Sequence, residues 1–252
     1  MDTNAPELRI LYRDDCLIAV RKPAGLLVHR SAIDRHERQF AMQLLRDQIG
    51  QRVYPVHRLD KPTSGVLLFA LDPQIATRLS EQFAGRETEK RYLAVVRGYT
   101  AEAARIDYPL KELHDRMTDA KADRDKDAQE AVTDFRRLAT IELPFSDGRH
   151  PTSRYSLIEA LPRSGRKHQI RRHMKHIFHP IVGDTTHGDG RHNRLFREQL
   201  ASHTLLLCAV ELGFSHPCTD ARIHIHSPLD EEFQRLVARF GWQDAIPPAL
   251  PQ

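Results

Sequence analysis

Short apolar runs and helical hydrophobic spacings follow one another along this chain, and together they predict its elements. An apolar run bounded by turn residues is typical of a strand, whereas apolar residues three and four positions apart are typical of a helix face. Strands are predicted over 8–11, 16–20, 66–71, 91–99, 132–143, 154–161, 205–214 and 222–226, and helices over 40–49, 73–84, 168–178 and 230–240. Because the two kinds of element do not alternate strictly, we predict an α+β fold with a mixed, mainly antiparallel sheet and packed helices.

Cap and turn residues indicate where several of these elements begin or end. Asp72 stands before a proline, which is the pattern of an N-cap followed by proline at the first helical position, and Gly85 then ends the helix. Ser164 and Gly165 predict a capped start for the helix that reaches residue 178. The polar, glycine-containing stretch 186–194 predicts a flexible loop.

Length and composition predict one folded unit. With 252 residues and 40% hydrophobic content the chain can bury one substantial core, so we predict a single domain over residues 1–252. The stretch 112–130 is highly charged and poor in large apolar side chains, which predicts a charged surface loop. The proline-rich stretch 243–252 predicts a loose tail.

Cysteine usage, hydropathy and charge narrow the compartment and the partners. No stretch approaches the ~20 consecutive apolar residues of a membrane span, and the first residues lack the pattern of a signal peptide. We therefore predict a protein without a membrane partner. The three cysteines are Cys16, Cys208 and Cys218, and they have no C-x-x-C spacing. This predicts a cytoplasmic protein without a disulfide framework or a zinc ribbon. The net charge is +4, and the basic clusters at 163–176 and 187–197 would attract a polyanion.

The segment 57–65, which reads HRLDKPTSG, is the strongest candidate for chemistry. Side chains alternate along an extended backbone, so Arg58 and Asp60 are expected on one side and Leu59 on the other, toward a core. The proline restrains the turn after Asp60, and Gly65 permits a tight turn into the apolar strand that follows. A lone aspartate in such a turn more often only accepts backbone amides. A specific role for Asp60 therefore depends on the rest of the chain.

Four separated motifs resemble those of the RluA-type pseudouridine synthases, in the order that the family has them. They are KPAG at 22–25, HRLDKPTSG at 57–65, EKRYLA at 89–94, and GRKHQIR at 165–171 with HPIVGD at 179–184. The resemblance implies the pseudouridine synthase catalytic fold over nearly the whole chain. It also implies an enzyme that isomerises uridine in RNA to pseudouridine.

The resemblance assigns the catalytic roles to three residues. Asp60 matches the catalytic aspartate, Arg171 the arginine that pairs with it, and Tyr92 the active-site tyrosine. Asp60 would attack either carbon 6 of the base or carbon 1′ of the ribose, and the sequence does not decide between them. A guanidinium can keep such a carboxylate ionised and oriented. Without the resemblance, Tyr92 is better explained as a half-buried strand tyrosine.

The candidate RNA contacts lie beside these three residues. A base inside a stem must be extruded before a carboxylate can reach it, and His57 and Arg58 are placed to fill the vacated stack or contact its phosphates. The basic face of the helix over 168–178 is a candidate for phosphate contacts, although a solvated basic face explains it equally well. The full set of predicted RNA-binding residues is His57, Arg58, Arg166, His168, Arg172 and Lys175.

Neither a cofactor nor a metal is predicted. The isomerisation involves no net oxidation, hydrolysis or energy input, and the chain has no P-loop and no dinucleotide-binding glycine pattern. His173, His176 and His179 invite a metal interpretation, but their helical spacing does not bring them together with cysteine partners. The predicted partner is a structured RNA, and no obligate protein partner is evident.

The choice of RNA depends on peripheral strings, including 28–31, 46–50, 187–194 and 240–242. These resemble the family members that act on uridine 65 of tRNA. Two alternatives remain: a synthase acting on ribosomal RNA or several RNAs, and an RNA-binding or RNA-folding protein whose isomerase activity is secondary or absent. We predict no separate N-terminal RNA-binding module, since the residues before Lys22 already read as sheet. Cys208 departs from the family pattern, which usually has histidine there.

Overall fold

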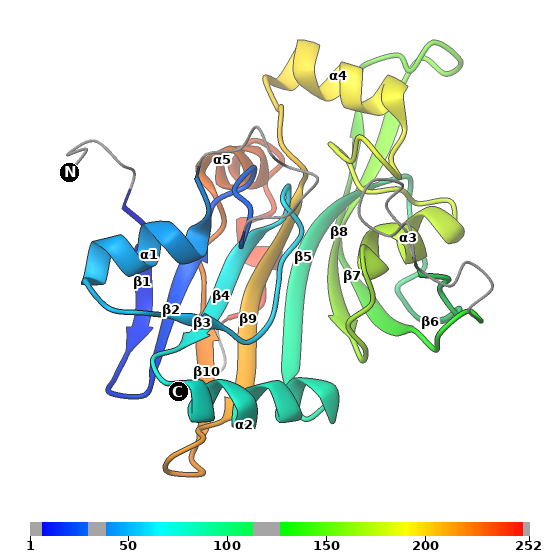
Figure 1. The fold of residues 1–252 in the computed structure, drawn as a ribbon. Helices are drawn as coiled ribbons and strands as arrows, with labels where there is room; N and C mark the ends of the chain where they lie inside the picture. The colour runs from blue at the N-terminus through cyan, green and yellow to red at the C-terminus, as the bar shows by residue number, and fades with distance from the viewer. Residues whose placement is uncertain (1–6, 30–38, 113–126, 249–252) are drawn as a thin grey trace.

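A single sheet runs through the protein, whose computed structural model describes residues 7–29, 39–112 and 127–248 (Figure 1). Its order is β1-β2-β4-β9-β5-β8-β7-β6, with β3 beside β4 and β10 beside β9. The pairings in this sheet are antiparallel except for β4 with β9, so the predicted mixed, mainly antiparallel sheet is confirmed. The strands are β1 (Arg9–Arg13), β2 (Leu17–Lys22), β3 (Tyr54–Pro55), β4 (Ser64–Ala70), β5 (Glu89–Arg97), β6 (Ala103–Asp107), β7 (Val132–Leu143), β8 (Ser153–Pro162), β9 (Leu207–Ser215) and β10 (Arg222–His226).

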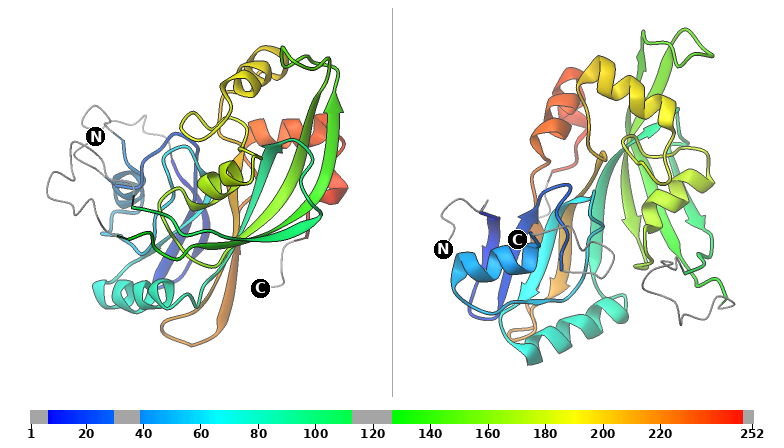
Figure 2. Two further views of the ribbon diagram at one scale, coloured as in Figure 1. Left: turned by 90° about the vertical axis from the view of Figure 1, so that its right-hand side faces the viewer. Right: turned by 45° about the horizontal axis from the view of Figure 1, so that its top comes forward.

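Helices pack on both faces of this sheet. They are α1 (Ala41–Ile49), α2 (Pro73–Ala84), α3 (Gln169–His176), α4 (Gly190–Leu200) and α5 (Glu231–Arg239), with a 3-10 turn η1 (Gln243–Ala245). The predicted cap of α2 is present, because the Asp72 carboxylate accepts the backbone amides of Gln74 and Ile75. Figure 2 shows α3 and α5 on opposite sides of β7 and β8.

The core forms on both faces of each half of the sheet. On one face of β5 and β8, Leu93 and Leu157 pack against α4 and α5, while on the other face Ala94 and Ile158 pack against α3. In the other half, β2 and β4 bury their faces against α1 and α2. Tyr92 contacts both the α1 cluster and the α3 cluster, and it therefore lies where the two halves meet.

The junction between the halves explains Gly65 better than a turn does. Gly65 has a φ of 117°, and a Cβ built on it would lie 2.1 Å from the carbonyl oxygen of Ala209. The parallel pairing of β4 with β9 covers Ser64 with Cys208 and Gly65 with Ala209. Glycine is needed here because the β9 backbone passes so closely.

Two expectations about the later half of the chain need correction. The helix predicted over 168–178 begins at Gln169, after His168 in a left-handed conformation, so Ser164 is not its N-cap. The segment predicted as a flexible loop over 186–194 contains the start of α4, whose N-cap Asp189 accepts the Arg191 amide. Helix α4 was not predicted because its first five residues include no large apolar side chain, so that Leu195, Phe196 and Leu200 all lie in its second half.

Other predicted segments lie partly outside the described residues. The charged loop predicted over 112–130 falls mainly on residues 113–126, which are not described. Part of the predicted tail is ordered, since η1 occupies Gln243–Ala245 and Arg91 donates a hydrogen bond to the carbonyl of Pro248. Among the described residues, no helix is both long and apolar enough to cross a membrane.

Candidate active site

A cavity of about 390 Å³ opens between the loop before β4, the start of β5 and the start of α3. We call it the central cavity. The predicted site residues that line it are His57, Arg58, Asp60, Tyr92, Arg166, His168 and Arg171. The fold thus brings together residues from segments that are far apart in sequence. Arg172 and Lys175 lie further along α3 and do not line it.

Arg171 is held between two carboxylates. Its Nε and Nη2 donate to the two oxygens of Asp184 at 2.7 and 2.9 Å, and its Nη1 donates to Asp60 Oδ2 at 3.1 Å. Arg171 is buried, with 3% of its side chain exposed, whereas Asp60 keeps 22% exposed toward the cavity. Burial opposes the charge of Arg171, but the hydrogen bonds and charge of Asp184, with the charge of Asp60, raise its pKa overall.

Asp184 fixes the orientation of the Arg171 side chain, a contact that the sequence did not predict. Its carboxylate forms a two-pronged pair with Arg171 and also accepts the backbone amides of Thr186 and His187, both at 2.9 Å. Burial alone would raise the pKa of Asp184, but the hydrogen bonds with Arg171 and these amides lower it overall. The motif at 179–184 contained this residue, yet nothing in its spacing indicated a contact with Arg171.

Lys22 anchors the loop that carries Asp60. Its fully buried ammonium donates to the carbonyl oxygens of Pro23, Leu26 and Lys61, at 2.7 to 3.1 Å. The Gly25 amide adds a second bond to the Lys61 carbonyl. Burial lowers the pKa of Lys22 to about 7, against the opposing effect of the Asp60 charge. The KPAG motif therefore fixes the loop immediately after the candidate nucleophile.

Tyr92 reaches the central cavity from β5. Its neighbours across the sheet are Ala160 and Ala209, which leave room for the ring, and β5 has an irregularity between Arg91 and Tyr92 on the β9 side. Burial, together with the charge of Asp60, raises the pKa of Tyr92 well above its usual value. The phenol is therefore protonated at neutral pH, and it offers both a flat apolar face and a hydroxyl.

His57 and Arg58 differ although they are adjacent. The Nε2 atom of His57 accepts the Leu68 amide at 3.0 Å, and its ring stacks on Phe83 with centroids 4.8 Å apart. Burial and the charge of Lys90 lower the pKa of His57 to about 3, so this ring is neutral and cannot attract phosphate. Attraction of phosphate by a charged His57 is therefore not expected, while a contact of its ring with RNA from the cavity wall stays a prediction. Arg58 is exposed and forms no ion pair among the described residues.

His168 and Arg166 precede α3 at the cavity wall. His168 Nδ1 and His187 Nε2 share a hydrogen bond at 2.9 Å, and His168 Nε2 lies 3.9 Å from Asp60 Oδ2. Burial lowers the pKa of His168 to about 4, with the Asp60 charge opposing, so the ring is neutral at physiological pH. Arg166 is half-buried, and its Nε donates to the carbonyl of Glu130.

The basic face of α3 is only partly open to solvent. Lys175 is exposed, whereas Arg172 is half-buried and donates to the Lys111 carbonyl at 2.9 Å. The histidines considered for metal binding turn to separate partners: His173 to Thr133 and Tyr108, His176 to the ring of Tyr108, and His179 to the Arg97 carbonyl. They do not converge on one point.

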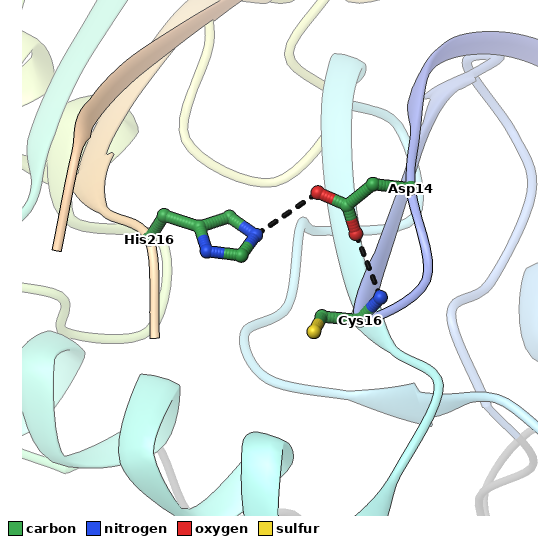
Figure 3. Close-up of side chains that lie close together, drawn as sticks. All are labelled: Asp14, Cys16 and His216. Carbon is green, nitrogen blue, oxygen red and sulfur yellow. Dashed lines mark hydrogen bonds and ion pairs between the residues drawn. The ribbon is translucent and has the colours of Figure 1, made fainter. Parts of the chain in front are cut away.

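A different group has atoms close enough to consider for a metal. The group consists of Asp14, Cys16 and His216, and each residue offers one possible ligand atom. These three atoms all lie within 4.8 Å of one another (Figure 3). His216 Nδ1 accepts the backbone amides of Cys218 and Thr219, so its proton lies on Nε2 and points to Asp14 at 2.9 Å. A metal-ligating histidine usually has the opposite arrangement, with the far nitrogen as donor. We therefore interpret this group as structural: its hydrogen bonds join the turn before β2 to the turn after β9.

The chain is similar to known proteins in both sequence and fold. The family model described as RNA pseudouridylate synthase matches residues 16–176. The chain belongs to the RNA pseudouridylate synthase family. The resemblance of its four motifs is thereby confirmed, and so is the expectation that it is an enzyme of the isomerase class.

Several relatives match this pseudouridylate synthase over nearly its whole length. A Vibrio cholerae protein named tRNA pseudouridine synthase C is 57% identical over 239 residues, covering 95% of this chain and 98% of its own. A Haemophilus ducreyi protein of the same name is 56% identical, covering 94% and 97%. The solved structure of human RNA pseudouridylate synthase domain containing 4 has a TM-score of 0.68 at 27% identity and covers 92% of this chain and 93% of its own.

Cys208, the departure from the family pattern, lies inside the pseudouridylate synthase core. It is fully buried in the cluster with Leu93 and Leu157, beside Ser64 at the β4–β9 junction. Burial raises its pKa to about 12, so the thiol stays protonated. Cys208 therefore acts as a small apolar side chain at this position.

Proposed function

We propose that this enzyme converts a uridine of tRNA, at position 65, to pseudouridine, with Asp60 as the nucleophile. The observation that carries the proposal is the partly exposed Asp60 carboxylate, held by Arg171 at the wall of the central cavity. The substrate is supported by the relatives named tRNA pseudouridine synthase C and by the peripheral strings.

In the proposed mechanism, Arg171 keeps Asp60 ionised and oriented while Asp60 attacks carbon 6 of the base or carbon 1′ of the ribose. The N1–C1′ bond breaks, the uracil turns, and a C5–C1′ bond forms. Carbon 5 then loses its proton and N1 gains one, so the uracil keeps its composition. Asp60 is released unchanged, and the balance requires no oxidant, reductant or nucleotide.

The other residues of the cavity would receive the flipped base. The Tyr92 ring provides a stacking face, and its protonated hydroxyl provides a polar contact near carbon 5. Arg58 is exposed near Asp60, whereas the His57 ring is bonded to the Leu68 amide. Arg58 is therefore better placed than His57 to fill the vacated stack. Lys175 and the partly open Arg172 would contact phosphates further along the RNA.

RNA binding is thus proposed for the surface of the catalytic domain itself, with Arg166 and His168 at the cavity wall. We place the reaction in the cytoplasm, where tRNA is modified in bacteria. Free Cys16, Cys208 and Cys218 suit that reducing compartment.

The decisive experiment compares Asp60→Asn with the parent. We expect Asp60→Asn to make no pseudouridine in tRNA from cells lacking the gene, while tRNA binding persists. Asp15→Asn, which alters an exposed carboxylate between β1 and β2 that does not line the cavity, is the matched control and should match the parent. Equal product formation by Asp60→Asn and the parent would remove Asp60 from the mechanism.

The substrate is tested separately, by mapping pseudouridine across tRNA and ribosomal RNA in cells lacking the gene. Loss at tRNA position 65 is the expected result. A loss confined to ribosomal RNA would contradict the tRNA substrate, and no loss in either RNA would favour an RNA-folding role.

A further inference from the structure

The residue that ends α3 has a backbone conformation that disfavours its own side chain. The His179 amide donates to the Met174 carbonyl and the Phe178 amide to the Lys175 carbonyl, which are the two bonds of a Schellman motif. Phe178 occupies the left-handed position of this motif, with a φ of 64°, where glycine is the usual residue. A side chain with a Cβ is strained there, so folding alone would favour glycine.

Phe178 is also the most exposed large apolar side chain in the described part of the protein. Its relative exposure is 79%, whereas Ile10, Tyr99 and Tyr108 reach 39 to 43%. A single exposed apolar side chain is ordinary, but one that also occupies a strained backbone position points to a function outside the core.

The strained residue is held firmly in place. The Phe178 carbonyl accepts Arg97 Nη2 at 3.0 Å, and Arg97 Nη1 forms an ion pair with Asp189 at 2.5 Å. His179 Nδ1 donates to the Arg97 carbonyl at 2.8 Å. The base of the aromatic side chain is therefore fixed before any partner arrives, which lowers the entropy lost on binding.

The surroundings of Phe178 are cationic and aromatic rather than apolar. Lys175 and His176 are exposed on the same turn of α3, and the His176 ring stacks on Tyr108 with centroids 3.7 Å apart and planes 16° apart. Positive charge beside flat rings complements a nucleic acid, in which phosphates alternate with bases. The same helix carries Arg171 seven residues earlier, which is about 10 Å along its axis.

We propose that Phe178 is a second RNA contact, on which a base of the substrate stacks while Lys175 neutralises a neighbouring phosphate. The proposal rests on the proposed function, because it gives the same RNA a second point of attachment. That attachment would help to determine which uridine reaches the central cavity.

The test uses Phe178→Gly, because relief of strain should preserve or raise stability while loss of the aromatic ring should weaken RNA binding. Glycine relieves the left-handed conformation, so the thermal unfolding midpoint should stay unchanged or rise. Loss of the stacking face should raise KM for tRNA about tenfold and leave kcat within about twofold. Ala201→Gly is the matched control: it alters another exposed left-handed C-cap, at the end of α4, and should leave KM unchanged. A lower unfolding midpoint with an unchanged KM would show a purely structural role and overturn the proposal.

A second variant observes the contact directly and needs no catalytic activity. Phe178→Trp places an exposed indole at the site, while the natural Trp242 is buried. We expect tRNA to quench the emission of Phe178→Trp and to leave the parent emission nearly unchanged. Unaltered emission at saturating tRNA, or a dimer that forms only when residue 178 is aromatic, would overturn the proposal. If emission is quenched but the parent forms no pseudouridine, the stacking contact stands and the proposed reaction fails.

Discussion

Two arginines of this protein each lie between two carboxylates, in different parts of the fold. Arg171 lies between Asp60 and Asp184 at the central cavity. Arg91 lies between Glu159 and Glu211 on the sheet, at 3.4 and 3.3 Å. Each arginine with its two carboxylates carries a net charge of −1. Residue type alone therefore does not separate a site for chemistry from a structural network.

The difference lies in how completely the carboxylates are enclosed. The Glu159 and Glu211 side chains are 8% and 5% exposed, and further partners surround them: Arg136 for Glu159, and His224 for Glu211. In the Arg171 group, Asp184 is fully enclosed but Asp60 faces the cavity. One carboxylate orients the arginine, which leaves the other available to a substrate.

Replacing Arg171 should change stability and activity more than replacing Arg91. Arg171→Met leaves the enclosed Asp184 without its cation, so we expect the free energy of unfolding to fall by about 3–5 kcal/mol. Product formation should fall at least a hundredfold. Urea unfolding and pseudouridine assays measure the two effects. Arg171→Lys keeps the charge and should lose less stability; a full loss in this control would show that geometry, and not charge, dominates.

Asp184→Asn tests whether Asp184 acts through Arg171. The neutral amide loses charge-assisted hydrogen bonds of about 1.5–3 kcal/mol, and a similar rise in the activation barrier would lower kcat about 10- to 100-fold. Since Asp184 does not face the cavity, KM should change little. Glu211→Gln is the equivalent change in the other group and should leave kcat unchanged. Equal effects of both variants on kcat would contradict the distinction.

Arg91→Met should cost stability but spare activity. Arg136 and His224 continue to contact the two glutamates, so the expected loss is about 1–3 kcal/mol, smaller than for Arg171→Met. Steady-state kinetics should give kcat within about twofold of the parent. A large loss of kcat in a folded variant would place the Arg91 group in the catalytic machinery.

Lowering the pH should reduce the difference in the free energy of unfolding between the parent and Asp184→Asn. The pKa of Asp184 is lowered in the folded protein, so its contribution to stability is fully present above the unfolded value of about 4 and is lost as pH falls through the folded pKa. Unfolding free energies measured from pH 5 down to pH 2 should therefore converge. A constant difference over this range would show that the carboxylate charge is not the source of the stability.

The exposed pair Arg46 and Asp47 should give the smallest effect. Their side chains are 50% and 66% exposed, so solvent screens the interaction, and Asp47→Asn should change the free energy of unfolding by less than about 0.5 kcal/mol. Thermal or urea unfolding checks this value. A larger change would show that solvent exposure does not distinguish this pair from the enclosed pairs of Arg171 and Arg91.

The sequence predicted the elements whose pattern is local. The Asp72 cap of α2 and the apolar runs of β4 and β9 are determined by neighbouring residues, and the structure has them. Helix α4 was missed because large apolar side chains occupy only its second half, and packing of these side chains into the core contributes the stability that a longer local pattern would have indicated.

The residues of the site were predicted unevenly for the same reason. Asp60, Tyr92 and Arg171 stand in recognisable motifs, and the structure brings them to one cavity. The contacts of Lys22 and Asp184 depend on how distant segments fold back, so their supporting roles were not visible. The sequence did not indicate that the Nε2 atom of His57 accepts the Leu68 amide, while the RNA contact of His57 stays a prediction.

The hydrogen bond from Arg171 to Asp60 joins residues 111 positions apart in the chain. Closing so long a loop has an entropic cost that must be met before the contact can stabilise anything. During synthesis, a chain that has emerged only as far as β8 contains the candidate nucleophile but not its arginine. If Asp60 and Arg171 act as proposed, isomerase activity can begin only after α3 has been made and has folded back onto the loop before β4.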